Sequence, residues 1–346
     1  MSASSNTVNL GTVFKGSKDG KVVAAQGTDK PVRPTDVVID ITHSGLCGTD
    51  LHFLKADMVL GHEGVGVVSQ VGSDVTRFKK GDRVGWGYNH DSCNHCKFCA
   101  SGWDTLCYDN KMYGQKDLDQ ASFGDRFVVH HDFCHAIPEG LSLRDAAPLQ
   151  CGGATVYGAI RHAGISAHHR AGVIGIGGLG HLAIQFLAKM GIDTVVFSGT
   201  ESKKDEAIKL GASEFVAAKT NPKLEGVKPV DFLFVATSAQ PDWSTYVNVV
   251  EKNGTIVPLS VDAGKMEIPY MPIVGKQLRI MGSLVAPRNV HREMLEFAAR
   301  LGVKPMVEEL PMTQEGLNTA VERLQKGDVR YRFVLTSQKN GGSANL

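Results

Sequence analysis

The chain has 346 residues, of which 42% are hydrophobic and 21% are charged. This length predicts about two domains, and the composition supplies enough apolar side chains for a sizeable core, which excludes disorder throughout. The chain has 37 Lys and Arg residues against 36 Asp and Glu, so its formal charge is only +1. Because no basic excess exists, we expect no nucleic acid partner and no attachment to an anionic membrane.

The chain shows no sign of a targeting or membrane-spanning segment. Residues 1–16 lack the apolar stretch of a secretory signal peptide. The long uncharged stretch 171–188 is rich in glycine at its start, which fits a turn followed by a helix better than a bilayer span. We therefore expect a cytoplasmic protein, whose seven cysteines are metal ligands or free thiols rather than disulfides.

Residues before about position 140 are typical of short strands and turns. Apolar, β-branched segments predict strands at 37–41, 64–71, 75–84, 127–130 and 133–137. No long amphipathic helix alternates with them, so this part is expected to be rich in β-structure.

After about residue 145, short apolar strands alternate with helices. Strands are expected at 172–174, 194–197, 232–236, 254–259 and 278–281, and helical segments at 158–163, 181–190 and 203–210. This alternation predicts a parallel sheet with helices on both faces. Helices near 291–301 and 317–324 and a strand at 331–335 follow. The fold class is therefore α/β: a β-rich domain, an inserted doubly wound parallel-sheet domain, and a returning segment.

Four cysteines are clustered within fifteen residues, at Cys93, Cys96, Cys99 and Cys107. Four thiolates can close one tetrahedral zinc site, and such closed sites are structural because no position is left for substrate. An iron–sulfur cluster is the rival, since ferredoxin-like runs also separate cysteines by two residues. The longer final gap and the absence of a Cys-Pro pair favour zinc.

Three further residues have the composition of a catalytic zinc site. Cys47 begins the segment Cys-Gly-Thr-Asp-Leu-His, His62 belongs to a Gly-His-Glu motif, and Cys151 lies far downstream. Two thiolates and one imidazole leave a fourth position open for substrate. Spacing alone does not fix this grouping, because a lone cysteine or histidine is usually a buried core residue.

A glycine motif follows the expected strand at 172–174 and opens the next helix. It consists of Gly175, Gly177, Gly178, Leu179 and Gly180 around Ile176. In this context the glycines allow a tight turn and let the backbone approach a dinucleotide pyrophosphate at the helix N-terminus. A plain glycine-rich turn is the alternative.

These motifs, in this order, resemble those of the zinc-dependent medium-chain alcohol dehydrogenases from about residue 37 to residue 335. The segment around Ser198, Gly199 and Thr200 and the tail 326–333 resemble the cinnamyl-alcohol-dehydrogenase-like branch. The resemblance implies a GroES-like catalytic domain at 1–153 and 285–346, a Rossmann domain at 154–284, and a homodimer. Only residues 53–61 separate His52 from His62, fewer than is usual in the family, so substrate identity is the least transferable inference.

The resemblance also implies roles for individual residues. Cys47, His62 and Cys151 would bind the catalytic zinc, with Glu63 as an occasional alternative ligand, and Asp50 would orient His62. Thr49 would take the alcohol proton, and His52 would pass it to solvent by way of the nicotinamide ribose. The cofactor would contact the glycine motif and Thr155, Ser198, Gly199, Thr200, Lys203, Gly282 and Ser283.

The strand that follows the glycine motif ends without a carboxylate. An NAD-selective site places Asp or Glu about 20 residues beyond the motif, whereas this chain has Ser198, Gly199 and Thr200 there, followed by Lys203 and Lys204. We therefore expect NADP(H), together with two zinc ions per chain.

The favoured function is a zinc- and NADP(H)-dependent alcohol dehydrogenase that works mainly as an aldehyde reductase. Its substrate would be a primary alcohol or the corresponding aldehyde, aromatic and allylic ones included. Reduction of an activated C=C or C=N bond on the same fold and polyol oxidation are the enzymatic alternatives. A zinc-ribbon binding module is the alternative from another class, but Lys97 is the one basic residue of 93–107, so a phosphate-binding surface is missing.

Overall fold

The computed structural model describes residues 6–262 and 264–341 and divides into two compact units. The first unit comprises the chain up to Cys151, Pro287–Arg300 and the chain from Lys304 onward, and the second comprises Gly152–Ala286 and Leu301–Val303. The sequence placed the domain limits at 153/154 and 284/285 and did not separate residues 301–303. The expected fold class, a β-rich part with an inserted parallel-sheet part, is confirmed.

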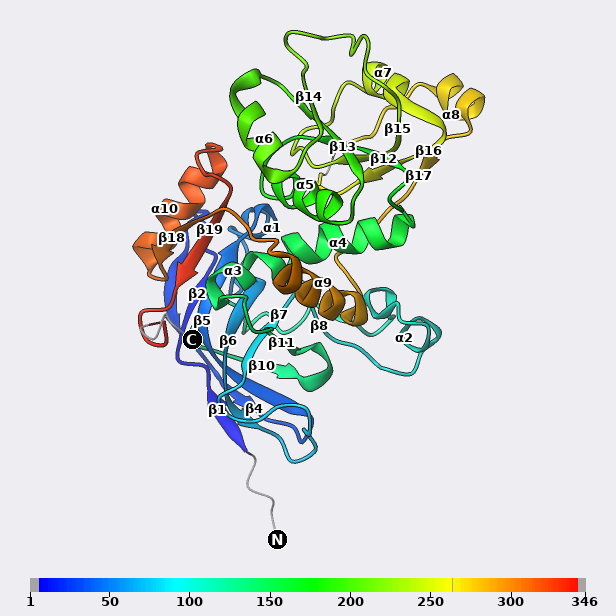
Figure 1. Cartoon of the computed structure of the whole chain (residues 1–346). Helices are drawn as coiled ribbons and strands as arrows, with labels where there is room; N and C mark the ends of the chain where they lie inside the picture. Colours follow the sequence, from blue (N-terminus) through cyan, green and yellow to red (C-terminus); the bar gives the residue numbers. More distant parts are fainter. Residues whose placement is uncertain (1–5, 263, 342–346) are drawn as a thin grey trace. The chain divides into compact units, whose positions relative to one another are not determined.

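The first unit is built on a mainly antiparallel sheet (Figure 1). Its strand order is β11 (His135–Ala136), β7 (Arg83–Trp86), β6 (Glu63–Val71), β5 (Asp36–Leu46), β19 (Arg332–Thr336) and β18 (Val307–Pro311), and β10 (Arg126–His130) also pairs with β5. Smaller pairs join β1 (Thr7–Asn9) to β4 (Asp29–Pro31), β2 (Thr12–Lys15) to β3 (Val23–Gln26), and β8 (Asn89–Asp91) to β9 (Lys111–Met112). The returning C-terminal segment thus enters the sheet directly beside β5.

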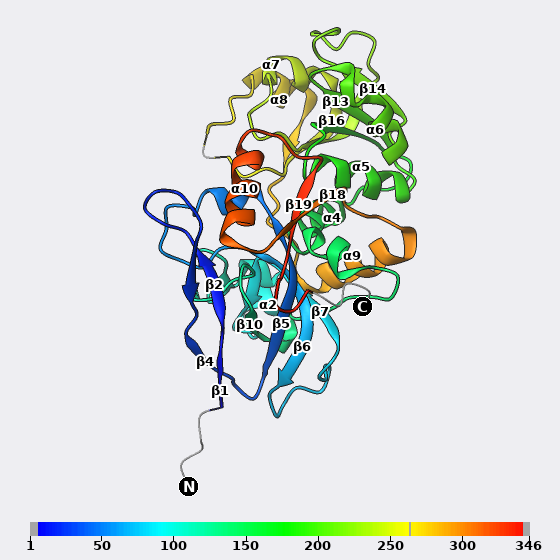
Figure 2. The ribbon, with the colours of Figure 1, turned by 90° about the vertical axis from the view of Figure 1, so that its left-hand side faces the viewer.

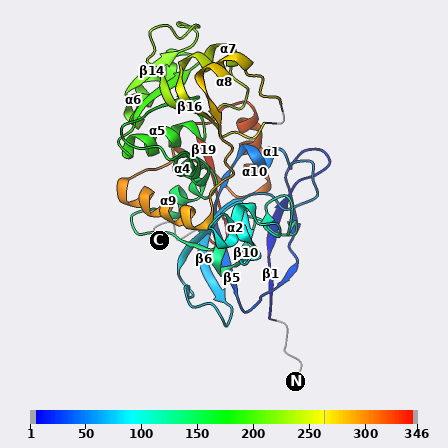
Figure 3. The same ribbon diagram turned by 90° about the vertical axis from the view of Figure 1, so that its right-hand side faces the viewer.

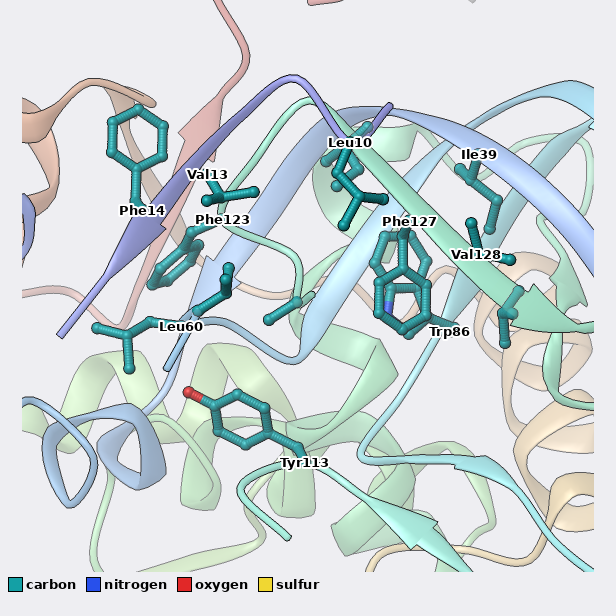
Figure 4. Packing of buried hydrophobic residues seen from close by; sticks show 14 of the residues in the cluster. Leu10, Val13, Phe14, Ile39, Leu60, Trp86, Tyr113, Phe123, Phe127 and Val128 are labelled. Carbon is teal, nitrogen blue, oxygen red and sulfur yellow. The ribbon is translucent and has the colours of Figure 1, made fainter. Parts of the chain in front are cut away.

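Helices of the first unit are mostly short. They are α1 (Gly48–Leu51), α2 (Lys97–Ala100), η1 (Asp104–Leu106), η2 (His131–Phe133), α3 (Leu143–Ala146), η3 (Pro148–Gln150), α9 (Arg288–Leu301) and α10 (Gln314–Gln325). Figure 1 shows the segment around α2 as a lobe extending away from the strands of this unit. The core between the strands is apolar and aromatic, and the rings of Trp86 and Phe127 stack with centroids 4.3 Å apart (Figure 4).

One expected strand, 75–84, is wrong over most of its length. The structure shows a strand only at Arg83–Trp86, preceded by a turn. Gly81 adopts a left-handed conformation with φ of +96°, and the Asp82 carboxylate accepts a hydrogen bond from the Lys79 amide. Similarly, the expected strand 133–137 is reduced to β11, because Phe133 ends a 3-10 turn. In both places a local turn interrupts the alternation of apolar residues.

The second unit contains a six-stranded sheet in which every neighbouring pair is parallel. The order is β14 (Glu214–Ala217), β13 (Asp193–Ser198), β12 (Arg170–Ile174), β15 (Val230–Val235), β16 (Val250–Pro258) and β17 (Arg279–Ile280). Its helical segments are α4 (Gly152–Ala163), α5 (Gly180–Lys189), η4 (Glu201–Lys203), α6 (Lys204–Leu210), α7 (Trp243–Tyr246), η5 (Val247–Val249) and α8 (Tyr270–Lys276).

Figures 2 and 3 show this sheet between α5 and α6 on one side and α7 and α8 on the other. The strand order reverses at β12, which has β13 as one neighbour and β15 as the other. In open parallel sheets, ligands bind at the carboxyl ends of the strands where the order reverses. The glycine motif follows β12 and therefore lies at this point. Within the described ranges, no helix combines the length and the apolar character needed to cross a membrane.

Candidate active site and metal centres

The two ends of neighbouring antiparallel strands bring Cys47 and His62 together. Cys47 follows the last residue of β5, and His62 precedes the first residue of β6, with Gly45 of β5 paired to Glu63 of β6. Cys151 follows η3, which packs against both strands. The ligand atoms of Cys47, His62, Glu63 and Cys151 all lie within 4.8 Å of one another, and all four residues are buried. The structure thus groups the residues that spacing alone left ungrouped.

The electrostatics of this group of residues favour the binding of a cation. The neighbouring thiol of Cys151, followed by the His62 imidazole and the charge of Arg332, lowers the pKa of Cys47 well below its usual value despite burial. The neighbouring thiol of Cys47, together with burial, raises the pKa of Cys151. One of the two thiols therefore loses its proton much more readily than the other, and a bound divalent cation would stabilise both as thiolates.

Asp50 fixes the orientation of the His62 imidazole. Its Oδ1 accepts a hydrogen bond from His62 Nδ1 at 2.9 Å, and its Oδ2 accepts one from the Cys47 amide at 2.9 Å. His62 Nε2 is then the nitrogen left for a metal, and this buried atom has no hydrogen-bond partner within the described part of the chain. An unpartnered buried nitrogen between two thiols fits zinc, which takes thiolate and imidazole ligands.

Glu63, the fourth member of this group, pairs with an arginine through one of its two carboxylate oxygens. Its Oε1 forms a buried ion pair with Arg332, and its Oε2 has no partner within the described residues. Gly45 makes room for this side chain, because a Cβ there would lie only 1.9 Å from Oε2. Burial raises the pKa of Glu63 to about 7, although Arg332 opposes the shift. A carboxylate oxygen of Glu63 lies within 4.8 Å of the ligand atoms of the other three residues, so Glu63 is close enough to approach a metal that they hold.

Thr49 lies beside this group, and His52 reaches solvent. The Oγ1 of Thr49 is 3.7 Å from the Sγ of Cys47, and Thr49 is half-buried. His52, at the end of α1, is exposed. A hydroxyl next to the ligands and an exposed imidazole one helical turn further on can form the inner and outer ends of a proton path.

The four clustered cysteines converge around a single point. Sγ atoms lie 3.5 Å apart for Cys93 and Cys107, 3.6 Å for Cys96 and Cys99, and 4.0 Å for Cys93 and Cys99. Four sulfurs at about 2.3 Å from zinc would be about 3.8 Å apart in a tetrahedron. Backbone amides support the sulfurs: those of Cys93 and Asp109 donate to Cys107, and that of Cys96 donates to Cys93. The donor set and its spacing fit a closed zinc site.

The glycine motif forms the turn between β12 and α5. Gly175 has φ of +92°, and a Cβ on Gly180 would lie 1.9 Å from the Gly175 carbonyl oxygen, so both positions require glycine. A Cβ on Gly177 would meet nothing within 4 Å, which leaves open space above that backbone. The His181 Nδ1 lies 2.8 Å from the Gly177 carbonyl oxygen and holds the turn. A backbone shaped in this way can cradle a pyrophosphate.

The end of β13 presents hydroxyls and one lysine near this turn. Gly199 and Thr200 are exposed, and the hydroxyls of Thr200 and Ser202 are 2.9 Å apart. Lys203 donates from Nζ to the Ile176 carbonyl oxygen at 2.8 Å, which places its charge beside the glycine motif. Glu201 instead contacts Lys204, 3.9 Å away, and accepts from Thr220.

The remaining expected cofactor residues also belong to the second unit. Thr155 is buried in α4, Gly282 is exposed, and Ser283 is half-buried after β17. Two residues that the sequence did not single out contact the group of Cys47, His62, Glu63 and Cys151. Arg332 forms an ion pair with Glu63, and Tyr113 stacks on His62. The spacing of residues in the sequence predicts neither contact, because strand pairing brings Arg332 to the group and ring stacking holds Tyr113 there.

A closed four-thiolate site, a second group of two thiolates and one imidazole, and a sheet of dinucleotide-binding type define a zinc-binding dehydrogenase. Family models agree: residues 33–139 match the alcohol dehydrogenase GroES-like domain, and residues 178–300 match the zinc-binding dehydrogenase domain. The chain belongs to the zinc-dependent medium-chain alcohol dehydrogenase family, and the expected resemblance is confirmed.

Several relatives cover nearly the whole chain. NADP-dependent alcohol dehydrogenase C 1 of Mycolicibacterium smegmatis is 36% identical over 325 residues, which are 89% of this chain and 92% of the relative. A probable cinnamyl alcohol dehydrogenase of Populus deltoides is 36% identical over 87% of this chain and 86% of its own length. The solved structure of a cinnamyl alcohol dehydrogenase from Sorghum bicolor has a TM-score of 0.88 at 32% identity and covers 98% of this chain and 99% of its own.

Proposed function

We propose that the protein interconverts primary alcohols and aldehydes with NADP(H), mainly as an aldehyde reductase, with one catalytic and one structural zinc per chain. The observation that carries this proposal is the buried group of Cys47, His62 and Cys151, with an unpartnered imidazole nitrogen and the Thr49 hydroxyl beside it. The names of relatives as NADP-dependent and cinnamyl alcohol dehydrogenases support it.

In this proposal each residue has one task. Zinc, when bound, would lower the pKa of an alcohol and polarise a carbonyl. Cys47, His62 and Cys151 would hold it, and Asp50 keeps the imidazole of His62 in the tautomer that exposes Nε2. Thr49 cannot carry a negative charge at neutral pH, so its Oγ1 only relays a proton. His52 is exposed, and an imidazole can both accept and donate a proton near neutral pH, which suits the solvent end of that relay.

The same proposal assigns catalysis to one domain and nucleotide binding to the other. The catalytic domain would be residues 1–153 and 285–346, and the nucleotide-binding domain residues 154–284, with contacts from Thr155, the glycine motif, Ser198, Gly199, Thr200, Lys203, Gly282 and Ser283. The reversal of strand order at β12 supports a cofactor at the glycine motif.

The test is a panel of aliphatic, aromatic and terpenoid aldehydes with NADPH and with NADH, before and after chelation of zinc. The expected result is oxidation of NADPH with several aldehydes and loss of that activity on chelation. Activity that is confined to activated C=C bonds, or that survives complete removal of zinc, would contradict the proposal.

We further propose that the protein is a cytoplasmic homodimer. Strand β17 lies at the edge of the parallel sheet with both of its residues exposed, and Tyr270, Met271 and Val274 of α8 are exposed as well. An uncovered strand edge with apolar neighbours is suited to pairing with a second copy. Light scattering of the purified protein should give twice the chain mass, and Ile280→Glu should shift it toward the monomer. Cell fractionation tests the location.

A further inference from the structure

The ring of Tyr113 lies flat against the imidazole of His62. The ring centroids are 4.7 Å apart with 29° between the planes. Phe53 and Tyr88 approach the Tyr113 ring edge-on, at 5.3 and 6.0 Å. Gly114, which follows in the chain, leaves room for Phe53, because a Cβ there would lie 2.3 Å from that ring. Tyr113 is 5% exposed, so its orientation is fixed from several sides.

The hydroxyl of Tyr113 joins the hydrogen bonds that hold Asp50. It accepts from the Gly61 amide at 3.1 Å and donates to the Asp50 carboxylate. Asp50 Oδ1 also accepts from the Gly61 amide, at 3.2 Å, besides its bond from His62. Figure 4 shows the hydroxyl of Tyr113 on the side of Leu60, the residue before Gly61. The phenol therefore supports the Asp50 carboxylate, which orients His62, and the Gly61 backbone, which precedes His62 in the chain.

We propose that Tyr113 is a positioning residue of the catalytic metal centre, which holds the His62 imidazole through ring stacking and through Asp50. This inference rests on the proposed function in taking His62 as a zinc ligand. The imidazole can rotate about its side-chain bonds unless Asp50 and a neighbouring ring restrain it. Loss of a residue that holds a ligating histidine typically lowers metal affinity by roughly 10–100-fold. Tyr113 restrains both the imidazole of His62 and the carboxylate that bonds it.

The alternative role, filling of the core, predicts a different pattern. Phenylalanine fills nearly the same space and keeps the stacking on His62, so packing alone would leave Tyr113→Phe close to the original protein. A positioning role depends on the hydroxyl, because without it Asp50 loses a donor and the Gly61 amide loses an acceptor. Tyr113→Leu removes both the hydroxyl and the stacking.

The experiment measures zinc release from the folded holoenzyme with a chromogenic chelator. Two kinetic phases are expected, and His62→Ala identifies the phase of the catalytic centre because that phase should vanish there. Tyr113→Phe should release this zinc roughly tenfold faster, with an unchanged phase for the four-cysteine site and an unchanged melting temperature. Tyr246→Phe, which removes a buried phenol from the second unit, should release both zincs at the original rates.

Release from Tyr113→Phe at the original rate would overturn the inference. Equal acceleration of both phases would also overturn it, since that would indicate general loosening of the protein. If Tyr113→Leu fails to fold, Tyr113→Phe still decides the question. Absence of a His62-dependent phase in the original protein would instead refute the proposed zinc centre itself.

Discussion

Glu63 and Arg332 form an ion pair in which neither side chain is more than 6% exposed, although 269 positions separate them in the chain. The pair arises because β19 runs antiparallel to β5, with Phe333 opposite Leu46, so Arg332 arrives level with the end of β5. Coulombic attraction to Glu63, Cys47 and Cys151 raises the pKa of Arg332 against the effect of burial. The C-terminal strand therefore supplies a fixed positive charge beside the proposed zinc ligands.

Removal of this arginine should be strongly destabilising. Loss of one partner from a buried ion pair typically costs about 3–5 kcal/mol, because the other charge remains buried. Arg332→Met should lower the free energy of unfolding by that amount in urea titrations at saturating zinc. The double variant with Glu63→Gln should recover much of the loss. Arg126→Met, which breaks a pair that is 33% exposed on both sides, should cost less than about 1 kcal/mol. Equal losses in Arg332→Met and Arg126→Met would show that the buried pair has no special weight.

The two metal centres should respond separately to substitution. Cys96→Ser or Cys99→Ser should chiefly lower the melting temperature, because the lobe at 93–107 is held together by its four thiols. Cys47→Ser or His62→Ala should chiefly abolish turnover. Elemental analysis should give two zinc ions in the original protein and one in each variant. Fully active protein with a single zinc per chain would contradict the assignment.

The Thr49 hydroxyl should be essential, whereas His52 should be partly replaceable. Thr49→Ala is expected to lose nearly all turnover while its circular dichroism spectrum and melting temperature stay unchanged, and Thr49→Ser should retain most activity. His52→Gln should be milder and should change the pH profile of kcat, because water can replace an exposed imidazole. Rates in Thr49→Ala equal to those of the original protein would refute the relay.

The sequence predicts the four-cysteine site from its spacing, whereas it predicts the group of Cys47, His62 and Cys151 from the ligand types and from the resemblance to a known family, because spacing alone does not join these three residues. It also predicts the parallel sheet and the glycine turn, where strand, turn and helix signals agree. Arg332 and Tyr113 escape prediction for a physical reason. Their contacts depend on strand pairing across the chain and on the angle between two rings, neither of which leaves a local pattern. The segment 75–84 differs for a local reason: the left-handed Gly81 and the hydrogen bond from the Lys79 amide to Asp82 form a turn that interrupts the alternation of apolar residues.

Two stacked, buried histidines should make the protein sensitive to acid. The rings of His135 and His291 are 4.1 Å apart. Burial, reinforced by the charge of Arg292, lowers the pKa of His291 to about 3, and burial also lowers the pKa of His135. Above about pH 6.5 both histidines are neutral in the folded and unfolded chains. Below it the unfolded chain takes up protons that the folded chain refuses, so stability falls as the pH falls from 6.5 toward 3.

His135→Phe should reduce this acid sensitivity. Phenylalanine keeps an aromatic ring against His291, and the His135 Nδ1 that it removes is buried with no partner in the described residues. Urea titrations at pH 7.5 and 5.5 and saturating zinc should show a stability difference smaller by about 1.4 kcal/mol than in the original protein. His168→Gln, which replaces an exposed histidine, serves as the control. An unchanged difference in His135→Phe would contradict this explanation.

The cofactor preference should be for NADP(H), because the end of β13 lacks the carboxylate of an NAD-selective site. Ser198, Gly199 and Thr200 occupy that position, and Gly199 has no atom within 4 Å of where a Cβ would lie. The nearby Lys203 ammonium, held on the Ile176 carbonyl oxygen, can turn to a 2′-phosphate. Glu201 is the first carboxylate along the chain after this segment, and it contacts Lys204 and Thr220.

Substitutions at these positions should separate the two cofactors. A hydrogen bond to a charged group contributes about 1.5–3 kcal/mol, so each phosphate contact should contribute roughly ten- to hundredfold in selectivity. Lys203→Ala should raise KM for NADPH by that factor and leave KM for NADH nearly unchanged. Gly199→Asp should weaken NADPH binding through charge repulsion and improve the use of NADH. Values of kcat/KM for both cofactors with one good aldehyde decide the question. A clear preference of the original protein for NADH would refute the assignment and would point to Glu201 as the residue that binds the ribose, which Glu201→Gln would then test.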